Sequence, residues 1–201
     1  AAMTQADADR YYQDYVHAIH AIGNDAAGSG VYEGNGIPVK LSAIHARYAR
    51  AQHERGMAEL LPGLTDLFLL AKQYDIGLNI DAEEANRLEL SLDLMEALVS
   101  DPDLAGFNGI GFVVQAYQKR CPFVIDYLVD LARRNKQKLM IRLVKGAYWD
   151  SEVKWAQVDG LEGYPVYTRK VHTDVSYLAC ARKLLAAQDA VFPQFATHNA
   201  Y

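Results

Sequence analysis

The chain has 201 residues, of which 51% are hydrophobic and 22% are charged, a balance that excludes disordered, collagen-like and mucin-like proteins. Lys and Arg total 20 against 25 Asp and Glu, so the formal net charge is −5 and a nucleic-acid-binding surface is not expected.

The chain begins with a helical pattern. Residues 4–22 predict a helix that Thr4 caps, because a side-chain oxygen at that position can accept from the first free backbone N–H groups. Its expected buried stripe is Tyr12, Val16, Ile19 and Ile22. Residues 24–35 are rich in Gly and small side chains and predict a loop, so residues 1–35 are interpreted as an N-terminal helix and a loop that leads into a larger domain.

Five short apolar runs follow, and each of them ends in polar residues. Their β-branched composition is typical of buried strands of a parallel sheet. The runs cover residues 37–45, 76–84, 110–120, 139–148 and 192–199.

Four helical patterns lie between these runs. The first is expected to open at Pro62 and to cover residues 64–74, because proline is favoured in the first turn of a helix. Asp101-Pro102 ends the second helix and Pro122 opens the third. The predicted buried stripes are Leu88, Leu92, Met95 and Val99 in the second helix, Ile125, Leu128, Val129 and Ala132 in the third, and Val171, Val175, Leu178 and Leu185 in a fourth over residues 169–187.

This alternation predicts an α/β fold that is either an open doubly wound sheet or a closed (βα)8 barrel of the TIM type. Gly109-Ile110-Gly111 precedes its strand, so it is not a dinucleotide-binding turn. A barrel spreads its ligand contacts over many strands, and the strand ends here do the same, which favours the barrel. The polar residues at these ends are Lys40, Asp81, Gln115, Arg142 and His198-Asn199.

A complete barrel needs eight strands and usually about 250 residues. The sequence predicts only the first five strands, so residues 36–201 are interpreted as a partial barrel, truncated after the fifth strand. A partial barrel leaves one edge of its sheet uncovered, and such an edge makes a protein unstable or prone to self-association. We therefore expect that the chain is a piece of a longer protein in which further strands cover this edge.

The segment RLVKGAYWD, residues 142–150, is the densest cluster of functional side chains. Two cations and two aromatic rings at a strand end suit a ligand that carries phosphates and a flat ring system. In the alternative interpretation, Arg142 and Lys145 pair with Asp81 and nearby acids, while Tyr148 and Trp149 cover the next helix.

Two more strand ends carry ionisable groups. Asp81 can bind an ammonium group or accept a proton, or instead Asp81 or Glu83 caps the following helix. Lys40 can hold a carboxylate or form a Schiff base, or instead pairs with Asp81.

His198 and the neighbouring acids do not predict a metal site. Asp81, Glu83, Glu84 and His198 could supply ligands, but the sequence has no HxH, HxxxH or clustered pair. A lone His at a strand end is more often a structural hydrogen-bonding residue than a ligand, yet beside four other polar strand ends His198-Asn199 stays open as a functional pair.

Six segments give the sequence a family resemblance. In chain order they are KLSAIHARY, NIDAEE, GFVVQAYQKR, RLVKGAYWD, EGYPVYTRK and FATHNA. Together they closely resemble the FAD-dependent proline dehydrogenase domain of bacterial bifunctional proline-utilisation proteins, over about residues 4–200. The resemblance implies a (βα)8 barrel that oxidises L-proline to Δ1-pyrroline-5-carboxylate by hydride transfer to FAD.

The resemblance also implies the roles of individual residues. Asp81 and Arg142 are catalytic, with Arg142 beside the flavin locus that gains negative charge, and Lys40, Asp81 and Tyr148 bind the substrate. The implied cofactor contacts are Ala82, Gln115, Arg142, Val144, Lys145, Gly146, Ala147, Tyr148, Trp149, Thr168, Thr197, His198 and Asn199.

Other features of the family lie outside the chain. An arginine pair in the last barrel helix, which clamps the proline carboxylate, falls beyond Tyr201, and so does a linked aldehyde dehydrogenase domain. The DNA-binding domain that some members carry is also missing from this segment. The implied electron acceptor is a membrane quinone.

The expected location is the cytoplasm, peripheral to the inner membrane. The first twenty residues lack the apolar core of a signal peptide, and no apolar run is long enough to span a bilayer. The two cysteines lie outside any CxxC motif, which favours reduced thiols. Two other functions remain open: an inactive, self-associating barrel fragment, and a lysine- or metal-dependent barrel lyase.

Overall fold

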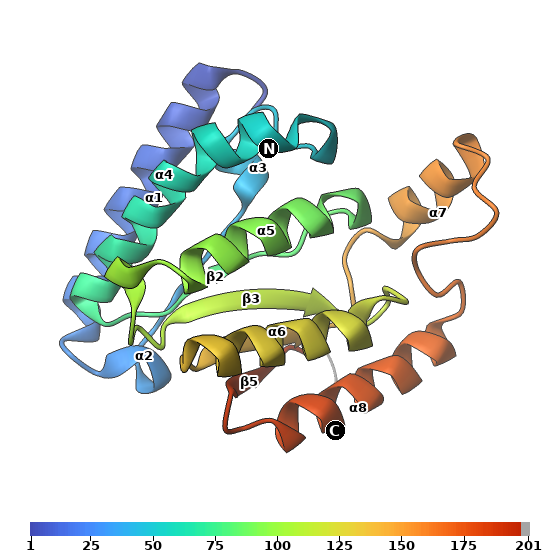
Figure 1. Ribbon diagram of the computed structural model, residues 1–201. Coiled ribbons are helices and arrows are strands. Elements are labelled where there is room, and N and C mark those ends of the chain that lie inside the picture. The colour runs from blue at the N-terminus through green and yellow to red at the C-terminus, as the bar shows by residue number, and fades with distance from the viewer. Residues whose placement is uncertain (198–201) are drawn as a thin grey trace.

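The computed structural model describes residues 1–197 and contains one parallel five-stranded sheet in the order β1-β2-β3-β4-β5. Each strand pairs with its neighbour in the chain, as consecutive βα units of a (βα)8 barrel do, so the predicted fold class is confirmed (Figure 1). The strands are β1 (Ile37–Val39), β2 (Leu78–Ile80), β3 (Ile110–Gln115), β4 (Leu139–Val144) and β5 (Val191–Phe195).

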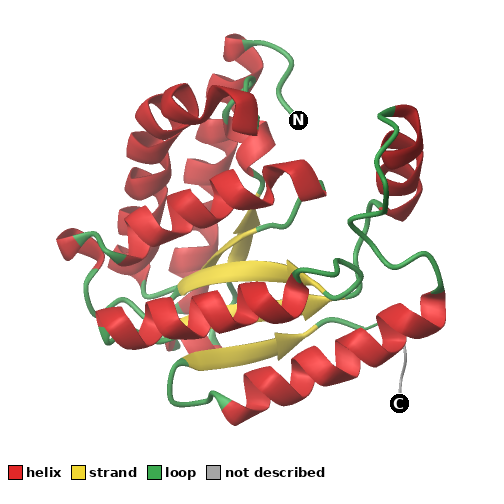
Figure 2. Cartoon of the chain, turned by 45° about the vertical axis from the view of Figure 1, so that its right-hand side comes forward, coloured by secondary structure: helices red, strands yellow, loops and turns green. Residues whose placement is uncertain are grey.

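Helices connect the strands and cover one face of the sheet (Figure 2). The helices are α1 (Gln5–Ala26), α2 (Gly30–Glu33), α3 (Leu41–Ile44), α4 (His53–Tyr74), α5 (Leu88–Val99), α6 (Cys121–Asn135), α7 (Trp149–Val158) and α8 (Lys170–Ala186). Short 3-10 turns cover Arg50–Gln52, Ala85–Arg87 and Pro102–Leu104. None of the helices in residues 1–197 is long and apolar enough to cross a membrane.

The core lies between the sheet and these helices. Ile80, Phe112 and Ile141 are buried in it, and burial of a side chain of this size contributes about 1.5–3 kcal/mol. Because side chains alternate along a strand, Val113 and Arg142 lie on the opposite face, at the interior of the barrel. The face under the helices is thus apolar, whereas the opposite face carries the polar residues Asn79, Gln115 and Arg142 among apolar ones.

Helix α1 confirms the predicted N-terminal helix. Thr4 Oγ1 accepts from the Asp7 backbone N at 3.1 Å, and the Asp7 carboxylate accepts from the Thr4 backbone N, so the two residues form a capping box. The predicted loop over residues 24–35 is only partly correct. The helix continues to Ala26, and a short helix, α2, begins at Gly30, which like Gly28 has a positive φ.

The start of α4 was predicted wrongly. The helix begins at His53, and Pro62 lies in its interior on an exposed face. An interior proline removes one backbone hydrogen bond and costs about 3 kcal/mol. Leu60, Leu64 and Leu67 are buried on both sides of the proline, and their packing keeps the helix continuous.

The predicted stripe of α8 is also wrong, whereas those of α5 and α6 lie in the core or against it. In α8, Val171, Val175, Leu178 and Leu185 are exposed by 62%, 67%, 66% and 49%. The buried face instead consists of Thr173, Ser176, Cys180 and Leu184. Small side chains there allow a close approach of the helix: Ser176 Oγ donates to the Ala116 carbonyl at 2.8 Å, and Cys180 Sγ lies 3.7 Å from Cys121 Sγ, both thiols being free.

Two helices, not one, separate β4 from β5. The first of them, α7, was not predicted, and it stands apart from the helices that cover the sheet (Figures 1 and 2). We call α7 and the segment that returns from it, residues 149–169, the arm. Val166 in its returning part is buried and forms an antiparallel bridge with Gln118.

Candidate active site

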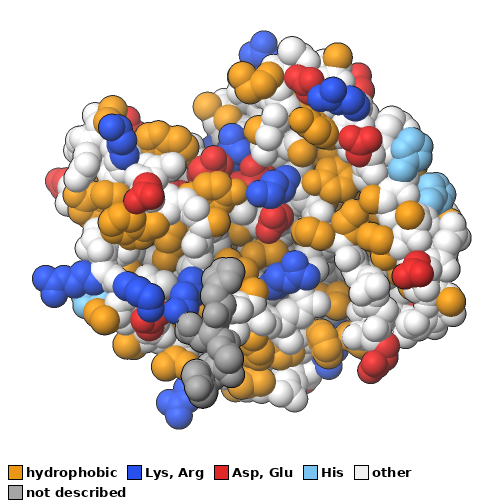
Figure 3. Space-filling view, turned by 180° about the vertical axis from the view of Figure 1, so that it is seen from behind, with side chains coloured by type: hydrophobic (Ala, Val, Ile, Leu, Met, Phe, Trp, Pro, Cys, Tyr) orange, Lys and Arg blue, Asp and Glu red, His pale blue; other side chains and the backbone are white. Residues whose placement is uncertain are grey.

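The carboxyl ends of the strands surround a cavity of about 620 Å³. This volume lies within the range of small-molecule sites, and its position is the one where barrel folds bind ligands. The lining residues are Lys40, Asp81, Ala82, Val113, Gln115, Val144, Lys145, Gly146, Ala147, Tyr148, Lys170, Phe195, Ala196 and Thr197. From behind, acidic and basic side chains gather near the middle of the molecule, beside a notch between two lobes (Figure 3).

Lys40, Asp81 and Tyr148 meet at this cavity, and we call them the Lys40 cluster. Lys40 Nζ lies 3.7 Å from Asp81 Oδ2 and 3.5 Å from Tyr148 Oη. The side chains of Lys40 and Asp81 are 48% and 28% exposed, so the pair is a loose one that water or a ligand can reach. Partial burial alone would lower the pKa of Lys40, but Tyr148 and Asp81 outweigh it, and the pKa lies above its ordinary value.

The three acids around the end of β2 have different partners. Glu83 accepts from the Ser42 backbone N at 3.0 Å, which caps α3 from another segment, and it also binds Arg87 at 2.7 Å. Glu84 lies 3.1 Å from the same guanidinium. The structure therefore assigns the capping and pairing roles to Glu83 and Glu84, while Asp81 faces the cavity.

Gln115 joins the turns that follow β2 and β4. Its side chain is buried, Nε2 donates to the Glu83 carbonyl at 2.8 Å, and Oε1 accepts from the Ala147 backbone N at 3.4 Å. The amide therefore fixes the distance between the segment that carries Asp81 and the segment that carries Tyr148.

The turn after β4 requires a glycine. Gly146 has φ +138°, and a Cβ atom there would lie 2.4 Å from the ring of Tyr117. The Tyr117 backbone N also donates to the Lys145 carbonyl at 2.7 Å, so the turn lies directly on the aromatic ring. Trp149 then begins α7, and its Nε1 donates to the Tyr167 carbonyl at 2.9 Å.

Lys145, Lys170 and Asp174 form a second charged group, which we call the Asp174 cluster. The two lysine Nζ atoms lie 2.6 Å and 2.7 Å from the two carboxylate oxygens. Hydrogen bonds from Lys145 and Lys170 hold the pKa of Asp174 below its ordinary value. Asp174 was missed in the sequence, although its spacing of four from Lys170 is typical of a helical ion pair.

Arg142 lies within β4, beside Val113 on one neighbouring strand and Gln194 on the other. Its Nε donates to Gln194 Oε1 at 3.1 Å, and Gln194 is a further residue that the sequence did not indicate. Arg142 does not pair with Asp81, in contrast to the alternative interpretation of residues 142–150.

The remaining predicted cofactor contacts, Thr168, Thr197, His198 and Asn199, do not form one group in the described residues. Thr168 is exposed near the end of the arm, and Thr197 lines the cavity. His198 and Asn199 lie outside the described residues. Within residues 1–197, no group of three or more His, Cys, Asp or Glu side chains could hold a metal ion.

The chain is similar to known proteins along its whole length. The family model described as "Proline dehydrogenase" matches residues 1–201. The chain is 70% identical over 201 residues to the bifunctional protein PutA of Klebsiella aerogenes and 69% identical to that of Escherichia coli, in each case over the whole chain but only 15% of the relative. The chain thus spans a small part of the curated relatives it matches.

Solved structures give the same result. A mutant form of proline utilization A (PutA) from Bradyrhizobium japonicum superimposes with a TM-score of 0.97 at 55% identity, over all of this chain and 21% of that one. The PutA of Bdellovibrio bacteriovorus inactivated by N-propargylglycine gives a TM-score of 0.90 at 27% identity, over 98% of this chain and 22% of that one.

Proposed function

The chain belongs to the proline dehydrogenase family, and on this premise we propose that it builds much of a site that oxidises L-proline to Δ1-pyrroline-5-carboxylate with FAD as the electron acceptor. The observation that carries the proposal is the Lys40 cluster. A cation and an anion lie 3.7 Å apart, both partly exposed, at the edge of a ligand-sized cavity. Such a pair matches the carboxylate and ammonium groups of a free amino acid.

The residues around the cavity fit FAD. The two lysines of the Asp174 cluster share one carboxylate, so the cluster keeps a net positive charge that suits a pyrophosphate. Val113, Val144 and Phe195 provide apolar walls for a flat ring. When bound, FAD supplies the acceptor for a hydride. The proposed contacts are Ala82, Gln115, Arg142, Val144, Lys145, Gly146, Ala147, Tyr148, Trp149, Thr168 and Thr197, together with His198 and Asn199 outside the described residues.

The protein groups have separate tasks in the proposed reaction. Lys40 and Tyr148 hold the substrate carboxylate, and Asp81 holds the ammonium group or accepts the proton that it loses. The carbon next to nitrogen gives up hydrogen with its electron pair, which the cofactor would accept, and the ammonium nitrogen gives up one proton. The product is a protonated cyclic imine, which becomes the free imine when it releases a second proton. Arg142 stabilises the negative charge that develops, and a charge-assisted hydrogen bond of this kind is worth about 1.5–3 kcal/mol.

The structure does not favour the lyase alternative. A Schiff-base lysine needs a lowered pKa, whereas the pKa of Lys40 is raised and Lys145 is paired with Asp174.

We extend the proposal to the whole protein. In this proposal, residues 1–35 are an N-terminal helix and loop and residues 36–201 are the first part of the barrel, with residues 198–201 outside the described residues. Because the PutA proteins that the chain matches over its whole length are called bifunctional, a covalently linked aldehyde dehydrogenase domain is proposed, together with a membrane quinone as the final acceptor and a cytoplasmic location at the membrane periphery.

The visible absorption spectrum of the purified, FAD-loaded protein, recorded with and without L-proline under anaerobic conditions, tests the proposal. Bleaching of the flavin bands by L-proline supports it. A bound flavin that L-proline does not bleach contradicts the substrate assignment, and failure to bind flavin contradicts the cofactor assignment for this chain.

Borohydride treatment with a carbonyl substrate tests the lyase alternative and is expected to leave Lys40 and Lys145 unmodified. Light scattering tests the alternative of an inactive, self-associating fragment.

A further inference from the structure

The arm has little apolar attachment to the barrel. Trp149, Trp155 and Val158 on α7 are all exposed, as is Leu161 just after it. Figures 1 and 2 show α7 away from the layer formed by α5, α6 and α8. Among the hydrophobic residues of α7 only the small side chain of Ala156 is buried, so hydrophobic burial contributes little to the position of this helix.

The other buried residue of this helix is Glu152, a charged residue that is only 4% exposed. Its Oε1 accepts from the backbone N of Ala85 at 2.5 Å. Ala85 belongs to the segment after β2 that also carries Asp81. The hydrogen bond thus connects α7 with one wall of the cavity.

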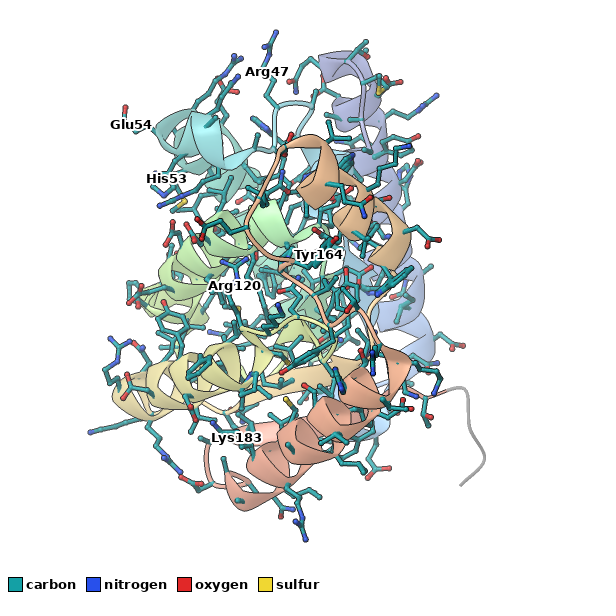
Figure 4. The ribbon with its side chains drawn as sticks, turned by 90° about the vertical axis from the view of Figure 1, so that its right-hand side faces the viewer. Arg47, His53, Glu54, Arg120, Tyr164 and Lys183 are labelled. Atoms are coloured by element: carbon teal, nitrogen blue, oxygen red, sulfur yellow. The ribbon has the colours of Figure 1, made fainter. Side chains whose placement is uncertain are left out.

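The surroundings of Glu152 make its burial costly. Burial raises its pKa, the Ala85 N–H opposes this shift, and the nearby Glu84 adds to it. Tyr117 Oη is buried close by, and burial, followed by the charge of Glu152, raises the pKa of this hydroxyl. Arg120, labelled in Figure 4, lies at the base of the arm and lines a second cavity together with Glu152. Since a buried acid is unfavourable without a partner, its bond to Ala85 must contribute to docking the arm.

The hydrogen bond between Glu152 and Ala85 can control the position of Tyr148. It directly precedes α7, and its carbonyl accepts from the Glu152 backbone N at 2.9 Å, one helical turn later. Its hydroxyl reaches Lys40 Nζ at 3.5 Å. Glu152 and Tyr148 therefore lie on the same turn of chain, and both contact segments that follow the first two strands.

We propose that Glu152 is a positioning residue of the amino-acid site: its carboxyl docks the first turns of α7 on the Ala85 backbone and thereby holds Tyr148 against Lys40. Only the expected effect on KM for L-proline rests on the proposed function. The docking of α7 by Glu152 does not depend on it.

Tryptophan fluorescence measures the docking without cofactor or substrate. The chain has 2 tryptophans, Trp149 and Trp155, and both belong to α7. Loss of a buried hydrogen bond is expected to raise the undocked population about 10-fold or more. Glu152→Ala should therefore shift the emission to longer wavelength and increase quenching by acrylamide, while the far-ultraviolet circular dichroism of the barrel stays constant.

Two further variants separate the hydrogen bond from other effects. Glu152→Gln keeps an oxygen acceptor for Ala85 and should restore the wild-type spectrum. Ala85→Pro removes the donor from the other side, and the backbone tolerates it because Glu84 has φ −63° and ψ 153° and Ala85 is the first residue of its 3-10 turn. Glu162→Ala, which removes an exposed acid of the same arm, is the matched control.

The kinetic measurement tests the positioning role. In the FAD-loaded protein, Glu152→Ala and Ala85→Pro should raise KM for L-proline about 10-fold, whereas Glu152→Gln and Glu162→Ala should not. An unchanged tryptophan signal in Glu152→Ala, a Glu152→Gln variant that behaves like Glu152→Ala, or a changed signal with an unchanged KM would overturn the proposal. If Glu152→Ala does not fold, Ala85→Pro decides. A wild-type protein whose flavin is not reduced by L-proline would refute the proposed function and not the docking by Glu152.

Discussion

The Lys40 cluster and the Asp174 cluster contain the same kinds of groups, yet their geometries differ. Lys40 Nζ is 3.7 Å from Asp81, whereas Lys145 and Lys170 approach Asp174 to 2.6 Å and 2.7 Å. The first cluster keeps hydrogen-bonding capacity for a ligand. The second has satisfied its carboxylate within the protein, so it stabilises the turn after β4 and offers a ligand only its surplus positive charge.

The difference has a structural origin. The Lys40 cluster draws its residues from the ends of β1, β2 and β4, and the backbone fixes their separation. The Asp174 cluster contains an i,i+4 pair on α8, where flexible side chains close the contact without any movement of the backbone. Separate rigid segments can thus hold opposite charges apart, and a substrate can enter between them.

Gly146→Ala is expected to have the largest effect, because the turn around Gly146 carries members of both clusters. A side chain at φ +138° is strained, and its Cβ would meet the Tyr117 ring at 2.4 Å. We expect a loss of at least about 2 kcal/mol in the free energy of unfolding, measured by urea denaturation.

Gly160→Ala is the matched control for this substitution. Gly160 also has a positive φ, of +64°, but an added Cβ would meet no atom within 4 Å. It should cost only the backbone strain of about 1–2 kcal/mol. Equal losses in the two variants would show that contact with Tyr117 does not position the turn.

Asp81→Asn removes the negative charge of the Lys40 cluster and should have an intermediate effect, on activity. A neutral amide cannot replace a carboxylate opposite an ammonium group, so kcat/KM for L-proline should fall by about 10- to 100-fold. Thermal stability should change little, because the pair is loose and partly exposed. Steady-state kinetics of the FAD-loaded protein measure this effect, and an unchanged kcat/KM would remove Asp81 from the site.

The smallest expected effect is the change with pH in the thermal stability that the Asp174 cluster contributes. The folded-state pKa of Asp174 is depressed, so its contribution to stability is complete above the ordinary pKa of 3.8 and is lost as the pH falls through the folded value. The difference in Tm between the wild type and Asp174→Asn should be constant at neutral pH and should vanish in acid. A difference that persists in acid would mean that the lysines do not stabilise the ionised carboxyl.

Much of the fold was readable from the sequence because its signals are local. Apolar β-branched runs gave all five strands, and Thr4 gave the start of α1. Errors arose where packing overrides a local rule. Pro62 usually opens a helix, but buried leucines on both sides keep α4 continuous. In α8 both faces carry apolar residues, and only contact with α6 and with Ala116, just after β3, decides that Ser176 and Cys180 are buried.

The candidate site was also predicted in part from local signals and in part decided by tertiary contacts. Parallel strands bring their carboxyl ends to one edge, so the sequence by itself determined that Lys40, Asp81, Gln115 and Tyr148 would lie near one another. Glu152 and Gln194 carry no local signal, since each acts on a residue that is far away in the sequence. The i,i+4 spacing of Asp174 indicates its pairing with Lys170 but not with its distant second partner, Lys145. Only the tertiary structure decided which charges are already satisfied and which remain open, because that depends on distances between segments that the chain order does not specify.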